Sequence, residues 1–136
     1  MKNTCYTCFR IVGSFDPAAV TEWLGLQPER SHGAQELRRD GKPYGFAVWE
    51  IGKCDEYSAE ISGQMRKTIA PLLDKTALLN RLREEKDVRF YLEIVPCLYA
   101  DEPSPCLAPP LDIVDFCHAT RTEMDIDLYI YDSREA

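Results

Sequence analysis

The sequence has 136 residues, of which 45% are hydrophobic and 29% charged, and its formal net charge is −7 at pH 7. This is the composition of an ordinary globular protein, and a chain of this length is expected to form a single domain, residues 1–136, around one hydrophobic core. Because no apolar run approaches the roughly 20 residues of a membrane span and the opening segment lacks a cleavable signal, we expect a soluble, cytoplasmic protein without membrane contact.

The first predicted strand covers residues 5–13, which are rich in residues that favour β-structure. Asp16 and Pro17 then predict the start of a short helix. The Asp side chain can accept a hydrogen bond from a free backbone N–H group, and Pro has no N–H group that needs a partner. Apolar side chains share one face of this helix, and Gly25 is expected to end it.

Residues 27–43 contain several prolines and glycines among polar residues and predict a loop of unusual length for a compact domain. Loops of this kind are often functional or mobile. A second strand is expected at residues 44–51, where nearly every position is apolar or aromatic. Such a strand is expected to be partly covered on both faces.

Two helices are predicted after the second strand, separated by Pro71. The first carries an apolar side chain at every fourth position, namely Tyr57, Ile61, Met65 and Ile69. Asp74 is a suitable cap for the second helix, in which three leucines face the core. Asp87 is expected to end this second helix.

The third strand is predicted at residues 88–95, which alternate cleanly between apolar and polar side chains. One face of this strand therefore belongs to the core, and the other carries Arg89, Tyr91 and Glu93 toward solvent. A proline-rich connection follows and leads into a short helix at about residues 111–119. The expected apolar positions of this helix are Leu111 and Val114, together with Cys117 or His118.

The last strand is predicted at residues 124–132, which also alternate. In this interpretation Ile126, Leu128 and Ile130 point into the core. The residues that alternate with them point outward, namely Asp125, Asp127, Tyr129 and Tyr131.

The order of elements is therefore β-α-β-α-β-α-β, which predicts an α+β fold. We expect a two-layer sandwich in which helices cover one face of a mainly antiparallel four-stranded sheet, ferredoxin-like in outline. The other face would display tyrosines and charges of both signs. Its predicted members are Tyr6, Arg10, Arg89, Tyr91, Glu93, Asp125, Asp127, Tyr129 and Tyr131. Such a surface can bind a partner, or it can be an ordinary solvated face with ion pairs between neighbouring strands.

Several segments together resemble a bacterial protein family known as domain of unknown function 4279. They are Gly13-Ser14-Phe15-Asp16-Pro17, Thr21-Glu22-Trp23-Leu24-Gly25-Leu26-Gln27-Pro28, Arg30-Ser31-His32, Trp49 and Asp125-Ile126-Asp127-Leu128-Tyr129. The resemblance extends from the first strand to the last. It implies a small α+β domain without an assigned activity, and it transfers no catalytic residues. The cysteine count and the proline-rich stretch after Pro96 set this chain apart.

Acidic residues are concentrated at the end of the chain. Residues 1–100 hold 14 basic and 14 acidic side chains, whereas residues 101–136 hold nine acidic and two basic ones. A nucleic-acid partner is disfavoured, because it would require a basic surface. A basic protein partner would be attracted to this segment, although the same acidity also serves solubility.

Six cysteines invite a disulfide or metal interpretation. In a reducing compartment disulfides are not expected. Cys5 and Cys8 form a C-x-x-C pattern, but on a strand two residues three apart face opposite ways, and no second pair of ligands follows them. We therefore expect buried free thiols, with no metal site and no cofactor.

Catalytic patterns are scarce. His32 and His118 are the two histidines, and the adjacent residues Cys117 and His118 diverge on a helix too far to form a dyad. Asp125 and Asp127 share one face of the predicted strand at a spacing of about 7 Å. That spacing suits an acid–base pair or a divalent metal, but neutralisation by Arg10 or Arg89 is the simpler interpretation. We therefore do not expect an enzyme.

These observations favour a non-catalytic protein-binding module that uses the uncovered sheet face or the acidic segment. A specific version is an immunity-type protein that masks a basic toxin domain. An alternative is a site for a small molecule or anion beneath the loop of residues 27–43, formed by Arg30, His32 and Trp49. A further alternative is self-association through the uncovered sheet face, as in a homodimer.

Overall fold

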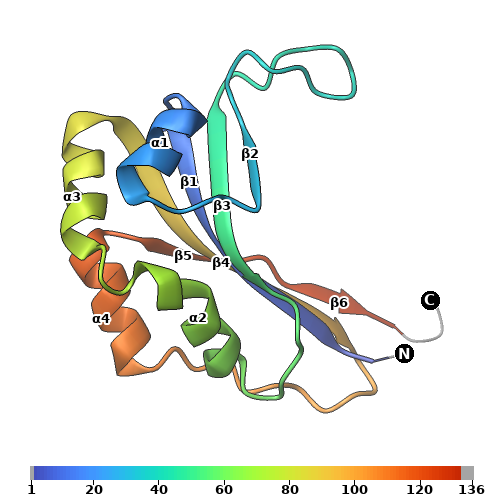
Figure 1. Cartoon of the computed structure of the whole chain (residues 1–136). Helices are drawn as coiled ribbons and strands as arrows, with labels where there is room; N and C mark the ends of the chain where they lie inside the picture. Colours follow the sequence, from blue (N-terminus) through green and yellow to red (C-terminus); the bar gives the residue numbers. More distant parts are fainter. Residues whose placement is uncertain (1, 133–136) are drawn as a thin grey trace.

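The computed structural model describes residues 2–132, which form an α+β structure with a mixed six-stranded sheet (Figure 1). The strands are β1 (Thr4–Ser14), β2 (Arg30–His32), β3 (Ala47–Cys54), β4 (Asp87–Tyr99), β5 (Glu123–Ile126) and β6 (Tyr129–Tyr131). The helices are α1 (Pro17–Leu24), α2 (Ile61–Ile69), α3 (Thr76–Glu85) and α4 (Leu111–Thr120), with a short 3-10 helix, η1 (Ala70–Leu72), after α2. None of the helices in this part of the chain has the length and hydrophobicity needed to cross a bilayer.

The sheet differs from the expected four-stranded antiparallel arrangement. Its strand order is β2-β3-β1-β4-β5, and β6 pairs with the later part of β4. The pairs among β1, β2, β3 and β4 are antiparallel, whereas β5 and β6 both run parallel to β4. The α+β class is confirmed, but the ferredoxin-like outline is wrong. The predicted last strand runs parallel to its neighbour because α4 carries the chain back before β5 begins.

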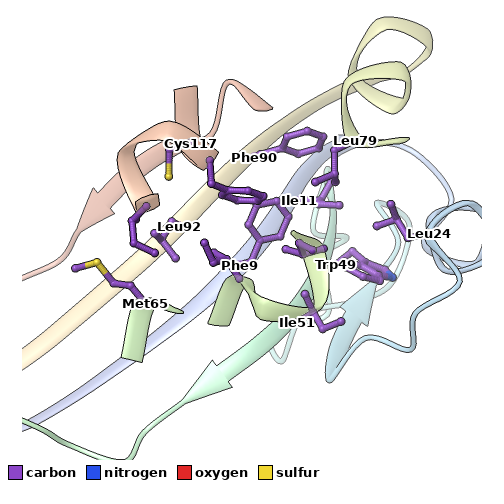
Figure 2. Close-up of a cluster of buried hydrophobic side chains, with 14 of the residues drawn as sticks. Phe9, Ile11, Leu24, Trp49, Ile51, Met65, Leu79, Phe90, Leu92 and Cys117 are labelled. Atoms are coloured by element: carbon purple, nitrogen blue, oxygen red, sulfur yellow. The ribbon is translucent and has the colours of Figure 1, made fainter. Parts of the chain in front are cut away.

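The hydrophobic core lies between the helices and one face of the sheet (Figures 1 and 2). Its largest fully buried side chains include Phe9 on β1, Trp49 on β3 and Phe90 on β4. Two indole N–H groups tie α1 to its neighbours. Trp49 donates to the hydroxyl of Thr21 at 3.0 Å, and Trp23 donates to the carbonyl oxygen of Leu78 on α3 at 2.9 Å.

The predicted boundaries of α1 are confirmed in detail. Asp16 accepts a hydrogen bond from the backbone N–H of Ala18, and Gly25 ends the helix in the left-handed conformation with φ of 66°. Pro71 also acts as predicted, because α2 gives way to η1 at this point. The predicted cap of α3 is wrong. Lys75 occupies that position and makes no side-chain capping bond.

The segment predicted as one long loop, residues 27–43, contains strand β2. The carboxylate of Glu29 anchors the start of this strand by accepting hydrogen bonds from the backbone N–H groups of Gly52 and Lys53. Beyond β2 the chain forms a hairpin closed by an antiparallel bridge between Leu37 and Pro43. The second predicted strand accordingly starts later than expected, at Ala47.

The predicted apolar face of α4 is wrong for Leu111 and Val114 and correct for Cys117. Leu111 and Val114 are 79% and 41% exposed, whereas Ile113, Phe116 and Cys117 are buried. The helix turns Phe116 toward the core, where its ring lies edge-on to that of Phe9 with centroids 6.3 Å apart. Burial of an aromatic ring contributes more than burial of Val114 would, so it decides the orientation.

The last predicted strand is broken in two, and its predicted inward residues are exposed. β5 ends at Ile126 and β6 starts at Tyr129. The side chains of Ile126, Leu128 and Ile130 are 46%, 51% and 67% exposed. Ile126 lies beside Ile94 and Ile130 beside Leu98, which places both on the helix side of the sheet. Ile130 remains exposed because β6 lies beyond the helix layer (Figure 1).

Candidate functional site

The open face of the sheet, opposite the helices, is set by the alternation of β1. Phe9 and Ile11 point into the core, so Cys8 and Arg10 point the other way. Strand register extends this face to the neighbouring strands. Its further members include Tyr6, Val12, Arg30, His32, Val48, Glu50, Arg89, Tyr91, Glu93, Val95 and Asp125.

Arg10 joins two carboxylates at the centre of the open face. Its guanidinium nitrogens lie 2.7 Å from Oε1 of Glu50 and 2.9 Å from Oε1 of Glu93. Arg30 approaches the same oxygen of Glu50 at 3.9 Å. Two guanidinium groups therefore face two carboxylates, and this cluster is electrically balanced without a ligand.

The thiol of Cys8 lies beside this cluster and donates a hydrogen bond to Oε2 of Glu93 at 3.6 Å. Burial, followed by the negative charge of Glu93, raises the pKa of Cys8 to about 12. A thiol with such a pKa is protonated at neutral pH and is a poor nucleophile. Cys5, on the core side of the same strand, also has a pKa raised by burial, to about 11. The predicted burial of the C-x-x-C pair is confirmed.

The other cysteines follow the prediction only in part. Cys54 and Cys117 are buried, whereas Cys97 is half-buried and Cys106 is exposed. All six thiols are free. Within residues 2–132 there is no group of three or more His, Cys, Asp or Glu side chains arranged to hold a metal ion.

His32 belongs to a small aromatic cluster at the base of the hairpin. Its ring stacks on that of Tyr44 with centroids 3.6 Å apart, and Phe46 lies edge-on to it at 5.8 Å. His32 is buried by these contacts. The imidazole of His32 therefore packs between aromatic rings. No periodic pattern in the sequence predicts Tyr44 and Phe46 as its neighbours.

Trp49 does not share a site with Arg30 and His32. Its neighbour on β2 is Ser31, and its side chain is fully enclosed between β3 and α1 on the helix side. Arg30 and His32 project from the opposite face. The expected floor of a pocket beneath residues 27–43 is therefore wrong, and the three predicted residues are not brought together.

Arg89 and Tyr91 remain on the open face as predicted, but neither pairs with an aspartate. Arg89 is exposed beside Val12, and Tyr91 is half-buried between Arg10 and Glu123 in the strand register. Among the described residues, Asp125 and Asp127 form no ion pair. The expected neutralisation by Arg10 or Arg89 is wrong, since Arg10 is held by Glu50 and Glu93 instead.

We use the term acidic edge for residues 123–131, which comprise β5, β6 and the bend between them. Three of these nine residues are acidic: Glu123, Asp125 and Asp127. Tyr129 donates a hydrogen bond from its hydroxyl to Asp127 at 2.9 Å, which raises the pKa of Tyr129. Tyr131 lies beside Tyr99 of β4, with ring centroids 5.5 Å apart.

The acidic edge also carries an unusual amount of exposed hydrophobic surface. Five of the large hydrophobic side chains exposed in residues 2–132 lie here: Ile126, Leu128, Tyr129, Ile130 and Tyr131. The strand break at residues 127–128 ends the regular spacing that would align Asp125 with Asp127. Asp127 nevertheless lies near the open face, because it accepts the hydrogen bond of Tyr129, which lies on that face.

The described surface also contains several clefts. One of about 370 Å³ lies between the end of α4 and β5 and includes His118, Arg121 and Met124 in its lining. Another, of about 290 Å³, lies near the N-terminus beside Tyr57 and Pro103. None of the predicted site residues lines either cleft.

A family described as "Domain of unknown function (DUF4279)" matches residues 3–131, which is nearly the whole chain. The chain belongs to this family. The family resemblance expected from the sequence is therefore confirmed, and its matched region includes both the open face and the acidic edge. Comparison with curated proteins and with solved structures found no match.

Proposed function

We propose that this protein is a non-catalytic protein-binding module whose acidic edge receives a basic partner protein. The observation that carries the proposal is the exposure of five large hydrophobic side chains on the same nine residues that hold three carboxylates. Exposed apolar patches bordered by polar groups are typical of interaction surfaces. In its most specific form, the proposal is an immunity-type protein that masks a basic toxin domain.

The charges favour this edge over the centre of the open face. Glu50 and Glu93 already pair with Arg10, so a partner would gain little by approaching them. Asp125 and Asp127 have no basic partner among the described residues. A basic surface could therefore approach these two carboxylates without first breaking an ion pair.

The same charges disfavour a homodimer through this edge. Two copies meeting there would bring Asp125 and Asp127 of each chain close to those of the other. Like charges at close range reduce affinity, whereas a basic partner is attracted. We retain the cytoplasmic location expected from the sequence, and fractionation of the source cells would test it.

Crosslinking in the source cells, followed by purification of the protein, tests the proposal. The variant Asp125→Lys/Asp127→Lys reverses the charge of the edge. Glu84→Lys/Glu85→Lys, on exposed positions of α3, makes the same change in net charge elsewhere. We expect a Lys- and Arg-rich protein to be recovered with the wild type and the α3 variant, and to fall by about tenfold or more with the edge variant.

Two outcomes would overturn the proposal. One is that no protein is recovered with the wild type. The other is that the edge variant retains the same partner as fully as the α3 variant does, because the edge would then not be the binding surface.

A further inference from the structure

The acidic edge is the outer border of the sheet. β5 and β6 both pair with β4, and no strand within residues 2–132 pairs with their other side. Backbone groups that face β4 are already engaged, since Asp127 donates to the carbonyl oxygen of Ile94 and Tyr131 accepts from Ala100. The alternate backbone groups of a border strand face outward and can pair with an added strand.

The opposite border of the sheet is less suitable for an added strand. It is formed by β2 alone, which has three residues and is followed by the hairpin, whereas the acidic edge offers both β5, with four residues, and β6, with three. Natural sheets protect their borders with short strands and with Lys or Pro residues. Residues 123–131 contain no Lys, Arg, Pro or Gly. Their acidic residues are therefore the charges that oppose unspecific strand pairing at this border.

The two faces of the acidic edge differ in chemistry. On the open face, Asp125, Tyr129 and Tyr131 lie beside Glu93, Cys97 and Tyr99 of β4. On the helix side, Ile126 and Ile130 lie beside Ile94 and Leu98. A strand added here would have every second side chain beside carboxylates and tyrosine rings, and the others beside aliphatic groups.

We infer that the partner binds by adding an extended segment to β5 and β6, and that this segment alternates basic and apolar residues. The inference rests on the proposed function and specifies its partner. Lys or Arg side chains on the open face would meet Asp125 and Asp127 and the rings of Tyr129 and Tyr131, which attract cations. Apolar side chains on the other face would cover Ile126 and Ile130.

Synthetic peptides of about eight residues, an ordinary strand length, test the order of residues that the inference requires. One peptide alternates Lys and Val, and a second has the same composition with all Lys before all Val. Binding is measured by titration of the isotopically labelled full-length protein. Amide hydrogen exchange in residues 123–131 is followed in parallel. We expect the alternating peptide to bind about tenfold more tightly and to slow exchange of the outward amides.

Backbone methylation of the alternating peptide tests strand pairing directly. Methyl groups on the nitrogens of one edge of the peptide remove the donors on that edge and leave the side chains unchanged. Methylation of the edge that faces the protein should abolish binding, whereas methylation of the other edge should leave it within about twofold. As a matched control, Glu84→Lys/Glu85→Lys should bind the alternating peptide normally, and Asp125→Lys/Asp127→Lys should not.

Several outcomes would overturn this inference. Equal binding of the alternating and block-ordered peptides, or of both methylated peptides, would show charge attraction without strand pairing. Failure of every peptide to bind would also overturn the inference. The proposed function would still hold if crosslinking recovered a partner whose binding depends on the charge of the acidic edge. Light scattering that shows a dimer abolished by Ile130→Lys would assign the border to a second copy of the chain and also overturn the inference.

Discussion

Glu93 illustrates how one residue can belong to the open face and yet be unsuited to bind a ligand. Its side chain is buried, accepts a hydrogen bond from Cys8 and pairs with Arg10. Burial raises the pKa of Glu93 above its ordinary value of 4.5, although Arg10 opposes this shift. The folded protein therefore holds the proton of Glu93 more tightly than the unfolded chain does.

This raised pKa predicts a pH-dependent loss of stability. The free energy of unfolding should fall as pH rises from about 4.5, and the loss should be complete once pH exceeds the raised pKa of the folded state. In Glu93→Gln this decrease should disappear, because the amide cannot ionise but can still accept from Cys8 and Arg10. Urea unfolding of both proteins between about pH 4 and pH 8 measures the difference.

The control for this comparison is Glu84→Gln on α3, which removes one negative charge from an exposed position. It should leave the slope of stability against pH like that of the wild type. Parallel curves for the wild type and Glu93→Gln would contradict the prediction.

At the scale of elements, the contact of β3 with α2 depends on Gly52. This residue has φ of 75°, and a β-carbon here would overlap the carbonyl oxygen of Thr68. Gly52→Ala should therefore lower the free energy of unfolding by about 2 kcal/mol or more. Gly63 lies in α2 with open space around its α-carbon. Gly63→Ala should raise stability by up to about 1 kcal/mol, because Ala favours the helix.

Chemical denaturation of the two glycine variants under the same conditions checks this prediction. Thr68 also donates a hydrogen bond to the carbonyl oxygen of Gly52 at 2.6 Å, so a shift of either backbone would weaken that bond. If Gly52→Ala proved as stable as the wild type, the close approach of β3 and α2 would not be required.

Local patterns predicted the elements that depend on local chemistry. The cap at Asp16, the stop at Gly25 and the break at Pro71 are properties of neighbouring residues, and the structure has all three. The alternation of residues 88–95 correctly separated Phe90 from Glu93 by face, because period two directly reflects strand geometry. The predicted exposure of Glu93 to solvent is wrong, because this side chain is buried.

Long-range features could not be predicted in this way. Alternation predicts that Ile126 and Ile130 share a face, but it does not show whether a helix covers that face or which strand lies beside it. Arg10 was predicted on the open face, yet its partner Glu50 depends on the register between β1 and β3. The acidic edge therefore emerges only when the sheet is assembled.

For the whole molecule, the position of a side chain relative to the helix layer decides its contribution to stability. Ile94 and Ile126 lie side by side in β4 and β5, but Ile94 is fully buried and Ile126 is 46% exposed. Ile126→Ser should change the free energy of unfolding by no more than about 0.5 kcal/mol. Ile94→Ser should cost about 3 kcal/mol, because it leaves a cavity and buries a hydroxyl.

Denaturant unfolding of the two isoleucine variants measures this contrast. A loss of comparable size in both would mean that the acidic edge is part of the hydrophobic core. That result would remove the basis for treating Ile126 as part of an interaction surface.

The central position of β1 has a consequence for biosynthesis. β1 leaves the ribosome before both of its partners, because it pairs with β3 on one side and β4 on the other, and Thr4 pairs with Cys97. Pairing between segments so distant in sequence is slow to form. The nascent chain must therefore hold an apolar strand without its partners until β4 has been translated, and chaperones have their main opportunity to act during this interval.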